Sequence, residues 1–152
     1  MTNMETSTPQ VEIVPGFVYR TLLQFALLGT EIGKVSLSTD IAETLIELCP
    51  NLPHASIVLA MNEFTLGQQD AGIRSLEQTL KKFPDSQLGK AMLAVCLQST
   101  GRTGWQELLE SVINDGRDEH AIGLACALLG REHQSESAML SAESAPSTAI
   151  WG

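Results

Sequence analysis

Apolar residues recur along this chain at helical spacing, in short segments separated by glycine and proline. Residues three and four positions apart lie on one face of a helix, as Leu22, Phe25 and Ala26 do in the first segment. No segment shows the alternation of apolar and polar residues that is typical of a strand. The pattern predicts seven helices. The first begins at about Phe17, the second extends from a cap at Ser36 or Ser38 to Pro50, and the third from Pro53 to Gly67. The fourth extends from Asp70 to Phe83, the fifth from Asp85 or Ser86 to Gly101, the sixth from near Thr103 through Ile113, and the seventh from Glu119 to Leu129.

The same pattern returns after 34 residues. Four kinds of residue recur at this interval. They are a large apolar residue (Phe25, Leu59 and Leu93), an alanine (Ala26, Ala60 and Ala94), a glycine (Gly33, Gly67 and Gly101) and a proline (Pro50 and Pro84). A period of 34 with these residue types is typical of tetratricopeptide repeats, in which each unit is a helical hairpin. We therefore predict an all-α, tetratricopeptide-like right-handed array of about three helical hairpins plus a C-terminal capping helix.

Each periodic residue has a physical role in such a hairpin. The alanine lets the paired helices approach closely, the glycine fits a turn that needs a positive φ, and the proline ends the second helix. The first unit is the least regular, because it has Ser38 where alanine is usual and Gly29 inside its first helix. We expect that helix either to end early, at Leu28, or to be supported by a partner.

Composition divides the chain into three parts. Residues 1–16 are predicted to be a flexible leader, residues 17–130 the repeat domain, and residues 131–152, rich in Ser, Ala, Glu and Gln, a disordered tail.

The first helices of stacked hairpins form the inner wall of a curved array, and such walls bind partners. Here the inward positions are apolar, which predicts a groove for an amphipathic helix. The alternative is that the capping helix or the tail folds back and fills this groove. The predicted partner-binding residues are Leu23, Leu27, Ile57, Met61, Phe64, Leu88, Ala91 and Val95.

The charge limits the choice of partner. The formal net charge is −9, the sequence pI is about 4.6, and only nine Lys and Arg are present. Nucleic acids and anionic membranes need clustered basic residues, so we expect neither as a partner. No apolar run reaches the roughly 18–20 residues that cross a bilayer, and the polar first ten residues do not resemble a signal peptide. Three widely spaced cysteines indicate a reducing cytosol.

No constellation of residues indicates catalysis. His54, His120 and His133 lack the neighbours that a zinc or catalytic site requires. The segment 101–104 has two glycines but no lysine and no preceding strand, so it is not a phosphate-binding loop. We predict a protein that is not an enzyme and that holds no cofactor and no metal.

Two stretches resemble known proteins. Gly89–Leu97, followed by Gly101, Trp105 and Ala125–Leu129, resembles the Hrp-type cytoplasmic proteins of bacterial type III secretion, and Leu22–Thr30 resembles the start of the tetratricopeptide-like chaperones of the needle subunit. The resemblance implies a cytoplasmic bacterial chaperone, linked to virulence, that holds the amphipathic helix of a needle or filament subunit and prevents its premature polymerisation. It also implies a small helical co-chaperone. The alternative is a structural adaptor of the secretion apparatus without an export client.

Overall fold

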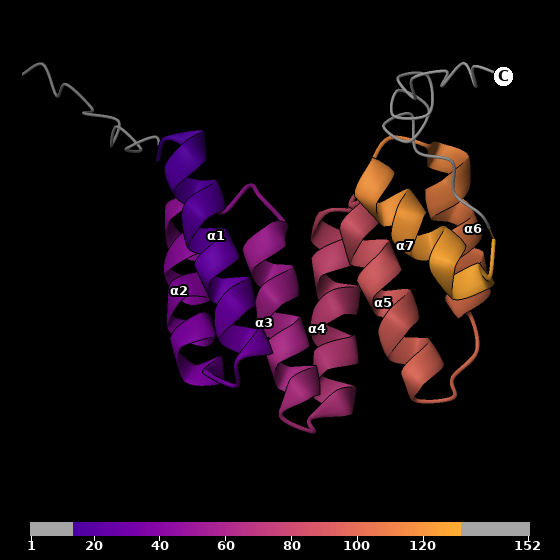
Figure 1. Ribbon diagram of the computed structural model, residues 1–152, viewed down its shortest axis with the longest axis horizontal. Coiled ribbons are helices and arrows are strands. Elements are labelled where there is room, and N and C mark those ends of the chain that lie inside the picture. Colours follow the sequence, from indigo (N-terminus) through magenta and orange to yellow (C-terminus); the bar gives the residue numbers. More distant parts are fainter. Residues whose placement is uncertain (1–13, 132–152) are drawn as a thin grey trace, which may run out of the picture. The chain divides into compact units, whose positions relative to one another are not determined.

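The computed structural model describes residues 14–131, which form seven α-helices and no strand (Figure 1). This confirms the all-α prediction. The helices are α1 (Gly16–Glu31), α2 (Val35–Leu48), α3 (His54–Thr65), α4 (Gln69–Lys82), α5 (Gln87–Ser99), α6 (Trp105–Asp115) and α7 (Glu119–Leu129).

The chain divides into two compact units within α4, between Ser75 and Leu76. In the N-terminal unit α1, α2 and α3 contact one another, and in the C-terminal unit α5, α6 and α7 do. The predicted leader lies mostly outside the described residues, and so does the predicted tail after Arg131. The helical part extends from Gly16 to Leu129, close to the predicted range of 17–130.

The three periodic glycines adopt positive φ angles of 76°, 84° and 68°. Each follows the first helix of a hairpin, and the next residue donates its N–H back to a carbonyl five residues earlier, which closes the helix end. The distances of these three bonds are 2.7 Å for Lys34 N to Gly29 O, 3.0 Å for Gln68 N to Glu63 O, and 2.9 Å for Arg102 N to Leu97 O. The 34-residue period of the sequence is therefore a period of hydrogen bonding as well.

Two helix starts are capped as their sequences suggest, and one is not. The Ser86 hydroxyl accepts the Gly89 N–H at 3.1 Å, and the Asp118 carboxylate accepts two N–H groups at the start of α7. The predicted cap of the second helix is wrong, because α2 begins at Val35 after Lys34, with no side-chain cap. Ser38 lies inside α2 and is fully buried.

The core of the N-terminal unit consists of alanines, branched residues and one tyrosine, from three helices. Gly29 is part of α1, so the helix does not end at Leu28 as one alternative proposed. A Cβ on Gly29 would lie 3.3 Å from the Ser38 Cβ, so the glycine allows α1 and α2 to cross closely. The buried core residues are Tyr19, Ala26, Ala42, Leu45, Ala55 and Val58.

The core of the C-terminal unit joins α5, α6 and α7. Its buried residues are Ala91, Ala94, Leu109, Val112, Ala121 and Ala125. All four residues that α5 and α7 contribute are alanines, and they pack against the branched residues Leu109 and Val112 of α6, so the helices approach closely. The half-buried Trp105 packs against this core from the start of α6.

Candidate helix-binding surface

Two rows of apolar side chains lie on neighbouring helices of the N-terminal unit. α1 carries Leu23 and Leu27, and α3 carries Ile57, Met61 and Phe64, each set at the spacing that places residues on one helix face. α1 and α3 contact each other. The structure thus brings five of the eight predicted groove residues onto two adjacent helices.

These five residues differ in what they expose. Leu27 is 47% exposed, and Leu23, Met61 and Phe64 are half-buried. Ile57 is only 3% exposed, so it is a core residue and cannot contact a partner, which corrects its place in the predicted set. Phe64 lies at the crossing with α4, where a Cβ on Gly72 would approach its Cβ to 3.0 Å.

The other three predicted residues belong to α5 in the C-terminal unit. Leu88 and Val95 are half-buried. Ala91 is fully buried and packs against residues of α6 and α7, because α5 is covered by both helices. Ala91 is therefore also a core residue, and the prediction that it binds a partner is wrong.

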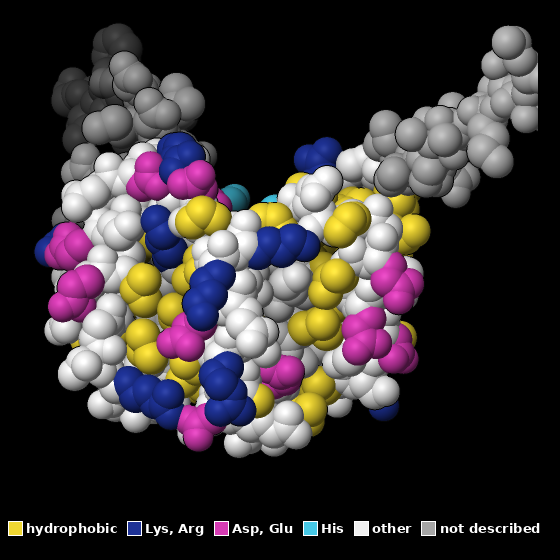
Figure 2. Space-filling model, turned by 180° about the vertical axis from the view of Figure 1, so that it is seen from behind, with side chains coloured by type: hydrophobic (Ala, Val, Ile, Leu, Met, Phe, Trp, Pro, Cys, Tyr) yellow, Lys and Arg dark blue, Asp and Glu magenta, His cyan; other side chains and the backbone are white. Residues whose placement is uncertain are grey.

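Sequence reasoning missed most of the apolar surface that the structure exposes. Among residues 14–131, every exposed large hydrophobic residue lies between Phe17 and Leu66, in the N-terminal unit. Figure 2 shows one face of the molecule, on which hydrophobic side chains lie exposed among acidic and basic ones. The exposed residues are Phe17, Phe25, Leu27, Leu28, Ile32, Leu37, Leu48, Leu52 and Leu66.

The 34-residue register explains why α1 exposes so many of them. Position 28 is 47% exposed, whereas its equivalents Asn62 and Cys96 are 2% and 0% exposed. Phe25 is 57% exposed, whereas Leu59 is half-buried and Leu93 is 6% exposed. In α3 these positions pack against the preceding hairpin, and no described helix precedes α1.

A cleft of about 190 Å³ opens between α1 and α2. Leu22 lines it from α1, and Asp40, Ile41 and Thr44 line it from α2. Leu37, Ile41, Thr44 and Leu48 follow one another on α2 at intervals of four, three and four residues, so they share one helix face. The cleft therefore lies on the same face of α2 as the exposed Leu37 and Leu48.

A buried polar network joins all three helices of the N-terminal unit. The Asn62 Oδ1 accepts the Thr30 hydroxyl at 2.6 Å, and its Nδ2 donates to Ser38 Oγ at 2.9 Å and to Thr39 Oγ1 at 3.2 Å. Hydrogen bonds inside a low-dielectric core fix geometry, because an unsatisfied buried polar group is costly. The network therefore fixes how α3 packs on the first hairpin.

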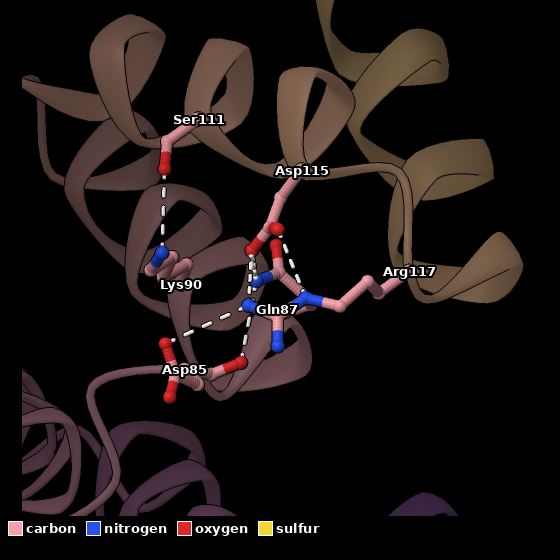
Figure 3. Close-up of polar contacts among 6 residues, drawn as sticks. All are labelled: Asp85, Gln87, Lys90, Ser111, Asp115 and Arg117. Carbon is pink, nitrogen blue, oxygen red and sulfur yellow. Dashed lines mark hydrogen bonds and ion pairs between the residues drawn. The ribbon is translucent and has the colours of Figure 1, made fainter.

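A second polar cluster lies in the C-terminal unit, where the start of α5 meets the end of α6 (Figure 3). Gln87, 5% exposed, donates from Nε2 to Asp115 and to the Asp85 carbonyl. Arg117 donates two hydrogen bonds to Asp115, at 2.9 and 2.7 Å. These Arg117 hydrogen bonds lower the pKa of the Asp115 carboxyl below its ordinary value of 3.8. These bonds join the start of α5 to the end of α6, while Gln87 Oε1 is buried without a hydrogen-bond partner among the described residues.

Cys96 is a fully buried cysteine of α5. Burial raises the pKa of the Cys96 thiol to about 11, so this thiol stays protonated at neutral pH. Within residues 14–131, no three His, Cys, Asp or Glu side chains are grouped so that they could hold a metal ion. Over the same residues, no helix is both long and apolar enough to cross a membrane.

This chain is similar to known proteins both in sequence and in fold. A family model described as bacterial type III secretion protein (HrpB1_HrpK) matches residues 9–134. Among solved structures, the crystal structure of MamA is similar with a TM-score of 0.51 at 20% identity, over 74% of this chain and 68% of that one, which shows a shared tetratricopeptide-like fold. A second structure, MamA AMB-1 P212121, has a TM-score of 0.46 at 17% identity, over 85% and 75%. No curated protein sequence matches.

Proposed function

Since this chain belongs to the bacterial type III secretion protein (HrpB1_HrpK) family, we propose that it is a type III secretion chaperone that binds an amphipathic helix of a needle or filament subunit. While bound, this helix is covered, and the subunit does not polymerise in the cytosol. The observation that best supports the proposal is the pair of apolar rows on α1 and α3, with Leu27 47% exposed between half-buried neighbours.

The rows suit a helix because of their spacing. An amphipathic helix presents apolar side chains at positions i, i+3, i+4 and i+7, and it packs best against two adjacent helices. Burying one leucine or methionine side chain fully contributes about 1.5–3 kcal/mol. An affinity of about 1 μM corresponds to roughly 8 kcal/mol. Leu23, Leu27 and Met61 are each partly buried already, and association itself costs free energy, so a helix bound at this affinity must also bury several apolar side chains of its own.

The test is co-expression with the needle subunit of the same secretion system, followed by sedimentation velocity of the purified material. The wild-type chain should hold the subunit in a small complex of defined stoichiometry. Leu27→Glu and Met61→Glu place a charge in the interface and should weaken binding by about tenfold or more. Leu37→Glu is the matched control, since it makes the same change at a 55% exposed leucine on α2 and should leave subunit binding unchanged.

Two results would count against the chaperone proposal. Retained binding by a Leu27→Glu variant with wild-type helicity would exclude the α1 row as the binding site. If the subunit still polymerises beside the wild-type chain, the structural adaptor becomes the better interpretation. A small helical co-chaperone is part of the proposal, and adding it should raise the yield of the complex.

A further inference from the structure

The first hairpin has a second apolar surface, which we call the outer face: Phe25 and Leu28 on α1, Leu37 and Leu48 on α2, and the cleft between them. Phe25 is three residues from Leu22, which lines the cleft, and Leu28 is three residues further along. Leu37 and Leu48 are each four residues from a cleft residue of α2. These intervals make them neighbours on the helix surface. The outer face is therefore continuous.

The repeat register indicates that this face accommodates a helix. The equivalent of Leu28 is Asn62, which contacts Ser38 and Thr39 on α2. The equivalent of Phe25 is Leu59, which packs against the core that α1 and α2 form. At these positions α3 therefore packs against a preceding helix, and α1 exposes the same positions at 47% and 57%.

Acidic side chains border the outer face. Asp40 lines the cleft, and Glu43 and Glu47 follow it on α2 at intervals of three and four residues. All three are exposed. A helix that fills the outer face brings its flank near these carboxylates, so lysines or arginines on that flank would be attracted and acidic residues would be repelled.

This charge argues against the chain's own segments as occupants. Residues 1–13 contain Glu5 and Glu12 and no Lys or Arg, and residues 132–152 contain three glutamates and no Lys or Arg. A second copy of the chain would bring the same α2 carboxylates to the interface. Each of these occupants would place acidic groups near acidic groups.

We propose that the outer face of the first hairpin binds an amphipathic helix from another protein, one with an apolar stripe and a basic flank. The apolar stripe packs on Phe25, Leu28 and Leu37, and the basic flank faces Asp40, Glu43 and Glu47. This surface is separate from the α1–α3 rows, because Phe25 lies about 160° around α1 from Leu27. The proposal therefore does not depend on the chaperone function.

The probe is a fluorescein-labelled amphipathic peptide of about 18 residues, with leucines on one face and lysines elsewhere, long enough to follow α1. A second peptide has the same leucines and glutamate in place of lysine. Fluorescence anisotropy with the full chain should show saturable binding of the lysine peptide and binding of the glutamate peptide that is weaker by about tenfold or more. Sedimentation velocity of the full chain alone, over a range of concentrations, accompanies it.

Variants test whether the peptide binds at the outer face. Phe25→Glu and Leu37→Glu should each weaken binding of the lysine peptide by about tenfold. The matched control Leu66→Glu makes the same change at a 62% exposed leucine that belongs to neither apolar surface, and it should change binding by less than about twofold. The double variant D40K/E47K should reverse the preference, so that the glutamate peptide binds more tightly. Far-UV circular dichroism checks that each variant keeps its helices.

Several outcomes would overturn the proposal. Equal binding of both peptides, or an equal loss in Leu66→Glu, would show an unspecific apolar contact. A concentration-dependent dimer that Phe25→Glu abolishes would show that a second copy occupies the face. A monomer that binds neither peptide would show that the outer face takes no basic helix, as when the chain's own terminal residues fill it.

Discussion

Replacement of Gly72 by alanine should destabilise the protein, although alanine favours helices. Gly72 is a buried residue of α4, and a Cβ added there would lie 2.7 Å from the Ala60 carbonyl oxygen and 3.0 Å from the Phe64 Cβ and N. Carbon atoms in contact prefer separations of about 3.5–4.0 Å. The atoms in the way are mostly backbone, so no rotamer change can relieve the clash, and α3 and α4 must move apart.

The sign of the change in the free energy of unfolding shows whether α3 and α4 cross too closely for a methyl group at position 72. If no close contact existed, Gly→Ala inside a helix would stabilise the protein by about 0.8–1.0 kcal/mol. Overpacking typically costs about 1–3 kcal/mol, and a contact of 2.7 Å with a backbone oxygen belongs to the upper part of that range. After the gain in helix propensity is subtracted, we expect a net loss of about 1–2 kcal/mol in the free energy of unfolding. For a chain of this size, that corresponds to a melting temperature lower by roughly 3–8 °C.

Urea unfolding followed by far-UV circular dichroism measures this loss, since the signal reports every helix of both units. The matched control is Gly16→Ala in α1, where an added Cβ meets no atom within 4 Å. Gly16 is the first residue of α1 and not an interior one, so the gain in helix propensity is small, and the variant should change the free energy of unfolding by less than about 0.5 kcal/mol. A Gly72→Ala variant as stable as the wild type, or more stable, would refute the close crossing of α3 and α4.

Two further substitutions test the polar clusters. Asn62→Ala removes the side chain that bonds to Thr30, Ser38 and Thr39. Because several buried hydroxyls lose a partner, it should lower the free energy of unfolding in urea by about 2–3 kcal/mol, and a loss below about 0.5 kcal/mol would contradict this. Asp115→Asn should lower the melting temperature at pH 7, because Arg117 stabilises the charged carboxylate and depresses its pKa. A depressed pKa gives stability that is present above the ordinary value of 3.8 and is lost as the pH falls through the lowered value. The melting temperatures of the wild type and Asp115→Asn should therefore converge toward about pH 2. A difference in melting temperature that is independent of pH would exclude the charged carboxylate as its cause.

Local signals of the sequence predicted the fold well, because each periodic residue acts within its own hairpin. A glycine that must adopt positive φ can be recognised from its interval alone, and Gly33, Gly67 and Gly101 do so. Ser86 and Asp118 cap helices through bonds two or three residues away, which are also local. Ser38 resembled a cap for the same reason, but its hydroxyl bonds across the unit to Thr30 and Asn62, which no local pattern shows.

The site was harder to predict, because exposure depends on what surrounds a helix. Periodicity placed Ile57 and Ala91 on the inner faces of their helices but did not show that neighbouring elements bury both. It also grouped Phe25 with Leu59 and Leu93 as equivalent, although the first is 57% exposed and the last 6%. One signal was available: an end repeat normally has a polar outer face, whereas this first helix carries Phe17, Phe25 and Leu28.

Leu28 and Asn62, which occupy the same register position, show how an apolar surface can bind tightly and still be selective. Asn62 makes polar bonds that only a matching helix can satisfy, so the packing of α3 on the first hairpin has one register. Leu28 occupies the same position of α1 and needs no hydrogen-bond partner, so helices of different apolar sequence can pack against it. Selectivity at the outer face must then come from charge, and the carboxylates of Asp40, Glu43 and Glu47 are placed to provide it by repelling acidic helices. Affinity and selectivity would therefore respond to different substitutions: Phe25→Glu should weaken every helix that binds there, whereas D40K/E47K should change only which helix is preferred.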